Sequence, residues 1–229
     1  YATIGDMRWA ELQCAAQALG LAGVIHLGYR DSGMPGSADN EHPEALARAP
    51  LEQVAGRIAK VIREVKPQVV ITFDPAGGSR HPDHIAIHKA TVKAFHTAGD
   101  NKLYPEAGPA FQPQKLYFGV RRYPLFRVLV KLMPLFGQDP HRLGRNKDID
   151  ITHMAAVQFP VHAIVRLTKQ AIAARDRAMT CHASQVGGRP LHLGLLGLAA
   201  GFSRRRDLYM CAYPPFHGHH RETDLFEGI

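Results

Sequence analysis

The stretch "VVITFDPAGGSRHPDH", residues 69–84, decides the fold class, because it joins an apolar run to a glycine-rich turn and then to a polar helix start. Residues 69–73 are apolar or β-branched at every position, which is typical of a parallel strand covered by helices on both faces. Pro82 suits the first turn of a helix, and Ile85, Val92 and Phe95 continue a helical spacing. The stretch therefore predicts a strand, a turn and a helix.

Upstream, apolar residues at three- and four-residue spacing predict one helix over 6–19, which Gly20 ends, and another over 51–65, before Pro67. Between them, "VIHLGY" (24–29) indicates a short strand. Residues 31–50 are rich in Gly, Pro, Asp and Asn and predict a long loop, which in a compact domain often carries function.

Downstream, "KLYFGV" (115–120) and "DLYMCAY" (207–213) indicate strands, 125–136 an apolar and basic helix, and 165–182 a polar helix. The alternation of helices and strands predicts a Rossmann-like α/β fold, with an open, mostly parallel sheet and helices on both faces. Ligands of such sheets bind beyond the carboxyl ends of the strands, where residues 74–84 fall.

Length and charge narrow the function classes. At 229 residues and 45% hydrophobic residues, the chain can bury the core of one large domain, so we expect a single domain over 1–229. A net charge of +8 favours anionic partners. The basic runs at 121–122 and 204–206 are not interleaved with aromatic residues, so we expect no nucleic-acid partner.

Three scattered cysteines, Cys14, Cys181 and Cys211, have no CxxC spacing. They predict neither a disulfide framework nor a cysteine zinc site, and they favour a cytoplasmic location. The apolar runs at 125–136 and 191–202 are too short or too glycine-rich to span a bilayer, so no stable membrane insertion is expected. Residues 121–137 could form an interfacial helix on a membrane, although packing on the sheet or over the pocket is the preferred interpretation.

Three histidines lie within the eight residues 81–88, which follow the predicted strand and turn. On a helix that opens at Pro82, His84 and His88 share one face, and His81 lies at the cap. Neutral imidazole is a good zinc ligand, and Asp83 could fix the tautomer of one ring. The alternative is that His81 and Asp83 only cap the helix and His88 is exposed. His42 and Glu44 are interpreted as loop residues.

"HPDH" after "VVITFDPAGG", with "RWAEL" (8–12), "YRDSGM" (29–34) and "CHASQ" (181–185), resembles the PIG-L family of zinc-dependent de-N-acetylases, also called LmbE-like proteins. The resemblance extends from the first helix to Gln185. It implies an LmbE-like fold, a zinc cofactor and the hydrolysis of an N-acetylated amino sugar or a related amide, a small-molecule substrate. A homo-oligomer is compatible with it.

The resemblance also implies roles for individual residues. His84 would be the metal ligand, His81 would stabilise the oxyanion or shuttle its proton, and Asp83 would orient His81. Arg8 would reach the substrate or its acetate, Asp31 would hold sugar hydroxyls, and Met34 would line the pocket. His182 is a substrate-binding candidate whose role is structural or pocket-facing. Taken without the family, Arg8 and Glu11 form an i, i+3 surface pair, and Asp31 starts a turn.

Two departures from the family pattern qualify these roles. Ser79 and Arg80 stand where the family carries a tyrosine, and no A-H-P-D-D-E motif, which supplies the other ligands and the general base, occurs in residues 1–229. We therefore expect an N-terminally truncated domain that lacks about 30 residues or more. Such a chain would expose an apolar sheet edge and, on its own, would bind zinc poorly and be inactive or nearly so. The alternative function is a non-catalytic α/β binding module or an inactive fragment of the same fold.

Overall fold

The computed structural model describes residues 3–120, 128, 130–142, 152, 158–186, 205–218 and 220–229. The chain divides into two compact units. Unit 1 comprises residues 1–27 and 166–207, and unit 2 comprises residues 28–165 and 208–229.

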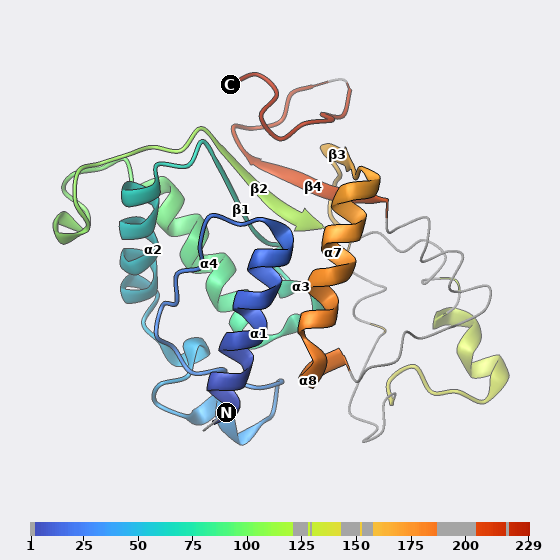
Figure 1. Ribbon diagram of the computed structural model, residues 1–229. Helices are drawn as coiled ribbons and strands as arrows, with labels where there is room; N and C mark the ends of the chain where they lie inside the picture. Colours follow the sequence, from blue (N-terminus) through green and yellow to red (C-terminus); the bar gives the residue numbers. More distant parts are fainter. Residues whose placement is uncertain are drawn as a thin grey trace. The chain divides into compact units, whose positions relative to one another are not determined.

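A four-stranded sheet forms the centre of unit 2 (Figure 1). Its strands, in the order β1-β2-β4-β3, are β1 (Val69–Phe73), β2 (Lys115–Val120), β4 (Arg206–Tyr213) and β3 (Ala163–Arg166). Strands β1 and β2 run parallel, with Val69 opposite Lys115 and Phe73 opposite Gly119. Strand β4 runs antiparallel to β2. The predicted α/β class with an open sheet is confirmed, and the sheet is mixed because β4 reverses direction.

Helices α2 (Leu51–Val65) and α4 (Pro82–Thr97) lie beside each other in Figure 1, and α4 also packs on β1. Both match the predicted bounds closely. Small residues allow the two helices to approach each other, since Ala55 and Ala59 of α2 and Ala90 and Ala94 of α4 are fully buried. Glycine-rich α3 (Gly77–Arg80) connects β1 to α4.

Strand β2 is an interior strand that is buried on both faces. Its side chains alternate between two cores, as the two-residue period of a strand requires. Leu116 and Phe118 pack with Phe95 of α4 on one face, and Tyr117 packs with Cys211 on the other.

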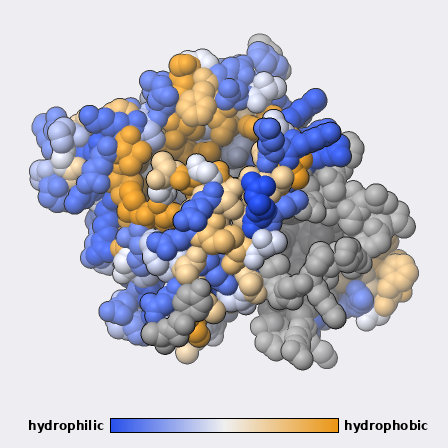
Figure 2. All heavy atoms as spheres, in the orientation of Figure 1, coloured by the Kyte–Doolittle hydropathy of each residue, from blue (hydrophilic) through white to orange (hydrophobic). Residues whose placement is uncertain are grey.

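Strand β1 lies at the edge of the described sheet. Ile71 is 50% exposed and Phe73 is 40% exposed, and apolar surface is visible in Figure 2 near the place of β1 in Figure 1. The sequence-based expectation of an exposed apolar edge is met at this strand.

The long loop predicted over 31–50 is compact. It contains two short 3-10 helices, η1 (Ala38–Glu41) and η2 (Leu46–Arg48), and Arg30 pairs with Ala45 as an isolated parallel bridge. The prediction of a strand at 24–29 is wrong, because this segment pairs with no strand of the described sheet. Its β-branched pattern is a local preference, and a strand also needs a neighbour that offers a backbone ladder.

Two further 3-10 helices lie in the part of unit 2 that the structure describes. Helix η3 (Pro105–Ala107) belongs to a loop held by Arg63, which is 2% exposed and donates to five backbone carbonyls of residues 98–108. Helix η4 (Met133–Phe136) falls within the helix predicted at 125–136. Residues 121–127 and 129 lie outside the described residues, so the interfacial helix proposed for 121–137 lies partly outside them as well.

Unit 1 contains α1 (Ile4–Leu19), α7 (Lys169–Cys181) and α8 (Ala183–Val186), and α1 packs against α7. Thr3 and Asp6 form a reciprocal capping box at the start of α1. Gly20 ends this helix, as predicted, and it takes the left-handed conformation, with φ of 70°.

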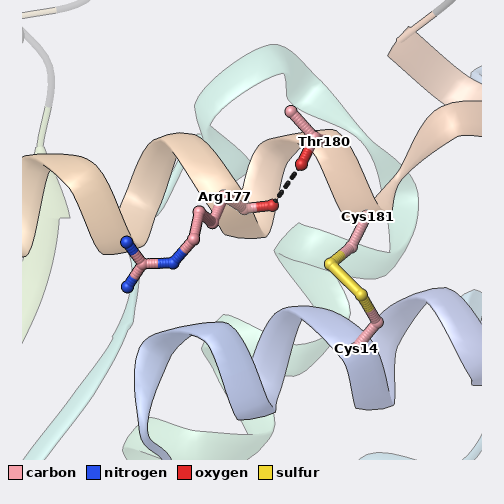
Figure 3. Close-up of a disulfide and its surroundings, with 4 residues drawn as sticks. All are labelled: Cys14, Arg177, Thr180 and Cys181. Carbon is pink, nitrogen blue, oxygen red and sulfur yellow. Dashed lines mark hydrogen bonds between the residues drawn. A yellow bond between two sulfur atoms is a disulfide. The ribbon is translucent and has the colours of Figure 1, made fainter.

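A disulfide joins Cys14 of α1 to Cys181 at the end of α7 (Figure 3). The prediction that the cysteines form no disulfide is therefore wrong. The two residues are 167 positions apart in sequence. Only the packing of α1 on α7 brings their Cα atoms to 5.8 Å, so their spacing gave no signal. Cys211 stays a buried thiol.

In the part of the chain that the structure describes, no helix combines the length and the apolar character needed to cross a bilayer.

Candidate active site

The site begins at the turn that follows β1, at the carboxyl edge of the sheet. The buried carboxylate of Asp74 accepts hydrogen bonds from the backbone N–H of Ala76 (2.9 Å) and Gly78 (3.1 Å), which closes the turn. Gly77 has φ of 66°, and a Cβ there would lie 3.0 Å from the backbone nitrogen of Ile85. Only glycine suits this position, because the turn returns directly onto the first turn of α4.

His81 is the N-cap of α4, as expected. Its Nδ1 accepts a hydrogen bond from the backbone N–H of Asp83 at 3.2 Å. An amide N–H can only donate, so Nδ1 carries the lone pair and, in the neutral ring, the proton resides on Nε2. His81 thus presents an N–H donor on its outer edge.

His84 carries the opposite tautomer. Its Nδ1 lies 3.1 Å from the carbonyl oxygen of Gly77, which can only accept, so Nδ1 bears the proton and, in the neutral ring, Nε2 keeps its lone pair. The ring stacks on Phe73, with centroids 3.9 Å apart, and its centroid is 4.9 Å from that of His81. Two neighbouring imidazoles therefore present a donor and an acceptor.

The carboxylate of Asp83 is bound by Ser32. The backbone N–H of Ser32 donates to Oδ2 at 3.0 Å, and its hydroxyl donates to Oδ1. The distance from Oδ2 to Nδ1 of His81 is 4.0 Å. The Asp83 residue thus contacts His81 through its backbone amide, while its carboxylate holds the loop that contains Ser32.

Asp31 and Met34 lie in that same loop. Oδ1 of Asp31 accepts a hydrogen bond from the backbone N–H of Gly33 at 2.7 Å, and Met34 is 53% exposed. Ligand atoms of Asp31, His81 and Asp83 all lie within 4.8 Å of one another, so this group could hold a metal ion. The fold brings the "YRDSGM" and "HPDH" motifs together.

The hydrogen bonds distinguish between the candidate metal ligands. Both carboxylate oxygens of Asp83 accept from Ser32, and the lone pair of His81 faces the amide of Asp83. His84, by contrast, keeps an available imidazole nitrogen whose tautomer a backbone carbonyl fixes, the usual arrangement for a metal-binding histidine. The chemistry of His84 therefore suits zinc.

His88 is not exposed, which corrects one of the alternatives considered for it. It is buried, its Nδ1 lies 2.7 Å from the carbonyl oxygen of Phe73, and its ring contacts Phe118 edge-on. His88 thus ties α4 to the last residue of β1 and supports the turn structurally.

Arg8 and His182 belong to unit 1. Glu11, one turn after Arg8, accepts hydrogen bonds from the backbone N–H (2.8 Å) and hydroxyl (2.7 Å) of Ser184. These bonds hold the pKa of the Glu11 carboxyl below its usual range. His182 caps α7, and its Nδ1 is buried without a hydrogen-bond partner in the described chain. The "CHASQ" motif is thus attached to α1 at Glu11 and at the disulfide.

A second polar cluster lies at the amino edge of the same sheet. The ammonium of Lys115 donates to Glu222 (2.6 Å), to the hydroxyl of Tyr117 (2.8 Å) and to the carbonyl of Glu227 (2.7 Å). Burial, and then the hydrogen bond to Glu222, raise the pKa of Tyr117 far above its usual range. A cavity of about 200 Å³ adjoins the cluster. Because all three ammonium hydrogens are used within the protein, we interpret this cluster as structural.

Sequence reasoning missed Ser32 and the Lys115 cluster. Ser32 stands inside the quoted "YRDSGM" motif, yet nothing local indicates that its hydroxyl bonds a residue 51 positions away. Lys115 opens a strand, where a lysine normally indicates an exposed end.

Comparisons with known proteins show that the chain is similar to de-N-acetylases. A family model described as PIG-L, GlcNAc-PI de-N-acetylase, matches residues 1–95, which include both motifs. The 1D-myo-inositol 2-acetamido-2-deoxy-alpha-D-glucopyranoside deacetylase of Streptomyces scabiei (strain 87.22) is 32% identical over 99% of this chain and 72% of its own length. The enzyme of the same name from Streptomyces avermitilis is 33% identical over 99% of this chain and 77% of its own length.

Among solved structures, the conserved protein TT1542 from Thermus thermophilus superposes with a TM-score of 0.54. It is 18% identical, and the match covers 94% of this chain and 77% of that one. This likeness supports the fold.

Proposed function

The chain belongs to the PIG-L family of de-N-acetylases, and on this premise we propose that it hydrolyses the acetamide of an N-acetylglucosamine unit linked to inositol. The reaction releases acetate and a free amine. The substrate class comes from the names of the relatives. The observation that carries the proposal is the pair of backbone hydrogen bonds at the carboxyl edge, one to each ring, from which opposite tautomers of His81 and His84 are inferred.

His81 would act on the carbonyl oxygen of the acetamide. Its Nε2–H is a fixed donor, because the backbone amide of Asp83 occupies the other ring nitrogen. As water adds to the carbonyl carbon, negative charge develops on the oxygen, and a preorganised donor stabilises that charge. Asp31 and Met34, on the adjoining loop, would contact the sugar. We also propose that Arg8 and His182 bind the substrate, as the family resemblance implies.

His84 would hold the zinc ion through Nε2. When bound, zinc would supply a Lewis acid that polarises the acetamide carbonyl. A catalytic zinc normally has three protein ligands, so His84 would be one member of the set.

The proposal is tested by incubating the purified chain with 1D-myo-inositol 2-acetamido-2-deoxy-alpha-D-glucopyranoside and measuring the primary amine released. The proposed function predicts release that a chelator abolishes and added zinc restores. The expectation from the sequence that residues 1–229 on their own are inactive or nearly so predicts almost no release, so the same assay decides between the two. N-acetylglucosamine and an N-acetylated peptide serve as substrate controls. Binding of the substrate without zinc-dependent amine release would favour the alternative, a non-catalytic binding module.

We also propose a cytoplasmic location. The disulfide between Cys14 and Cys181 is the observation against it, because the cytoplasm keeps most thiols reduced. Alkylation of thiols in freshly lysed cells, followed by mass spectrometry, decides the matter. A cytoplasmic protein should carry label on both cysteines, and an unlabelled pair would contradict the proposal.

A further inference from the structure

We infer that Ser32 is a positioning residue that holds the substrate-binding loop against the helix of the "HPDH" motif by way of Asp83. This inference rests on the proposed function, and it gives the Asp83 carboxylate a task other than the orientation of His81. The loop meant here is residues 31–41, which contains Asp31, Met34 and Ser37.

Every polar atom of Ser32 is bonded, and the residue is 0% exposed. Its N–H and hydroxyl both donate to Asp83, and its hydroxyl oxygen also accepts from the backbone N–H of Ala47 at 2.9 Å. Its carbonyl accepts from the side-chain amide of Asn40. One buried serine therefore connects helix α4, η2 and the loop around η1.

The loop is rigid enough to transmit this attachment to Asp31. Asn40 donates to the carbonyl of Met34 at 3.1 Å and accepts from the N–H of Gly36 at 3.0 Å, which ties the loop to itself. The carboxylate of Asp31 accepts from the N–H of Gly33. Because Asp31 directly precedes Ser32, its position relative to His81 follows from where Ser32 is fixed.

The chemistry of the bond also favours a positioning role. A carboxylate that accepts two hydrogen bonds from one residue fixes that residue in orientation as well as distance. Loss of the hydroxyl leaves the amide of Ala47 and Oδ1 of Asp83 each one partner short in a partly buried place, so the loop would relax to satisfy them. The loop would then hold the substrate less well, while His81 and His84 keep their own backbone partners.

The test compares the Ser32→Ala variant with wild type and with Ser37→Ala, a matched control. Ser37 lies in the same loop, and its hydroxyl accepts from the N–H of Asp39 without contacting Asp83. In the amine-release assay, we expect Ser32→Ala to raise KM about tenfold, with kcat within about twofold, and Ser37→Ala to change neither. In Ser32→Thr, which retains the hydroxyl, KM should lie between the values of Ser32→Ala and wild type.

A merely structural role predicts a different result. Partial unfolding lowers the concentration of active protein, and so lowers apparent kcat at unchanged KM, which would overturn the inference. Hydrogen exchange provides a readout that needs no activity. The amides of Ser32 and Ala47 should exchange about tenfold faster in Ser32→Ala than in wild type, and not in Ser37→Ala.

These two readouts separate the inference from the proposed function. If wild type releases no amine, the proposed function fails, and the attachment of the loop by Ser32 is then judged on exchange alone. Unchanged exchange in Ser32→Ala would refute the attachment whether or not the chain is an enzyme.

Discussion

The two edges of the sheet in unit 2 both contain charged and polar residues, but the edges use them differently. At the amino edge, Lys115, Tyr117 and Glu222 bond to one another and to the C-terminal segment. At the carboxyl edge, His81 and His84 bond to the backbone through one nitrogen each, and within the described residues their Nε2 atoms have no hydrogen-bond partner.

The difference indicates what each edge can do. A buried network whose hydrogen-bonding capacity is used inside the protein stabilises one conformation, and its loss costs stability. A cluster that is oriented by the backbone but not saturated can interact with a ligand, and its loss costs binding or rate. The following variants test whether the two edges separate in this way.

The largest effect is expected for His84→Ala at the carboxyl edge. Because Nε2 of His84 is the proposed zinc ligand, this variant should lose zinc and amine release together, with the circular dichroism spectrum unchanged. Zinc affinity is measured by competition with a chromophoric chelator. Equal affinity in wild type and variant would contradict the assignment of His84 as a ligand.

A large effect on stability is expected for Lys115→Met at the amino edge. Removing the ammonium leaves the largely buried carboxylate of Glu222 without its counter-charge, and the loss of one partner of a buried ion pair typically costs about 3–5 kcal/mol of unfolding free energy. Urea denaturation measures the loss. The double variant with Glu222→Gln should recover part of it, and activity per folded molecule should stay at the wild-type level. Reduced activity per folded molecule in Lys115→Met would contradict the interpretation of the amino edge as structural.

His81→Ala should leave zinc binding intact and slow the reaction. The loss of one oxyanion donor typically lowers kcat about a hundredfold to a thousandfold, or about 2.7–4 kcal/mol. Steady-state kinetics and zinc titration on the same preparation provide the measurement. If zinc is lost as well, His81 belongs to the ligand set, as its place in the group with Asp31 and Asp83 would allow.

The smallest effect concerns pH. The raised pKa of Tyr117 means that the folded protein keeps the phenol proton above pH 10, where the unfolded chain releases it. The resulting stability is fully present below pH 10 and falls as pH rises further. Tyr117→Phe should therefore flatten the fall of the urea midpoint between pH 9 and pH 11. The control is Tyr213→Phe, because Tyr213 of β4 is more exposed than Tyr117. Parallel curves for wild type and Tyr117→Phe would contradict the expectation.

Much of the fold could be predicted because its signals are local. Gly20 ends α1 and Pro82 opens α4, each within a residue or so of the expected place, and the run at 69–73 is β1. These features depend on backbone preferences and on the period of apolar residues, which a short window contains. The segment at 24–29 fails for the same reason, because its pattern is local while strand pairing is not.

The histidine cluster could be located from the sequence, but its chemistry could not. The sequence placed His81 at a helix cap and suggested a metal or relay site. It could not show which nitrogen of each ring carries the proton, since that follows from the amide of Asp83 and from the carbonyl of Gly77 in the returning turn. Nor could it show that Ser32 occupies the carboxylate of Asp83.

By itself, the sequence determined the α/β class, the strand and helix that flank residues 74–81, and the residue types available for amide hydrolysis. Only the tertiary structure decided their partners: Ser32 with Asp83, Lys115 with Glu222, and Cys14 with Cys181. The physical reason is distance along the chain. These pairs are 51, 107 and 167 positions apart, and no local preference encodes which distant atoms the packed helices and strands bring within bonding range.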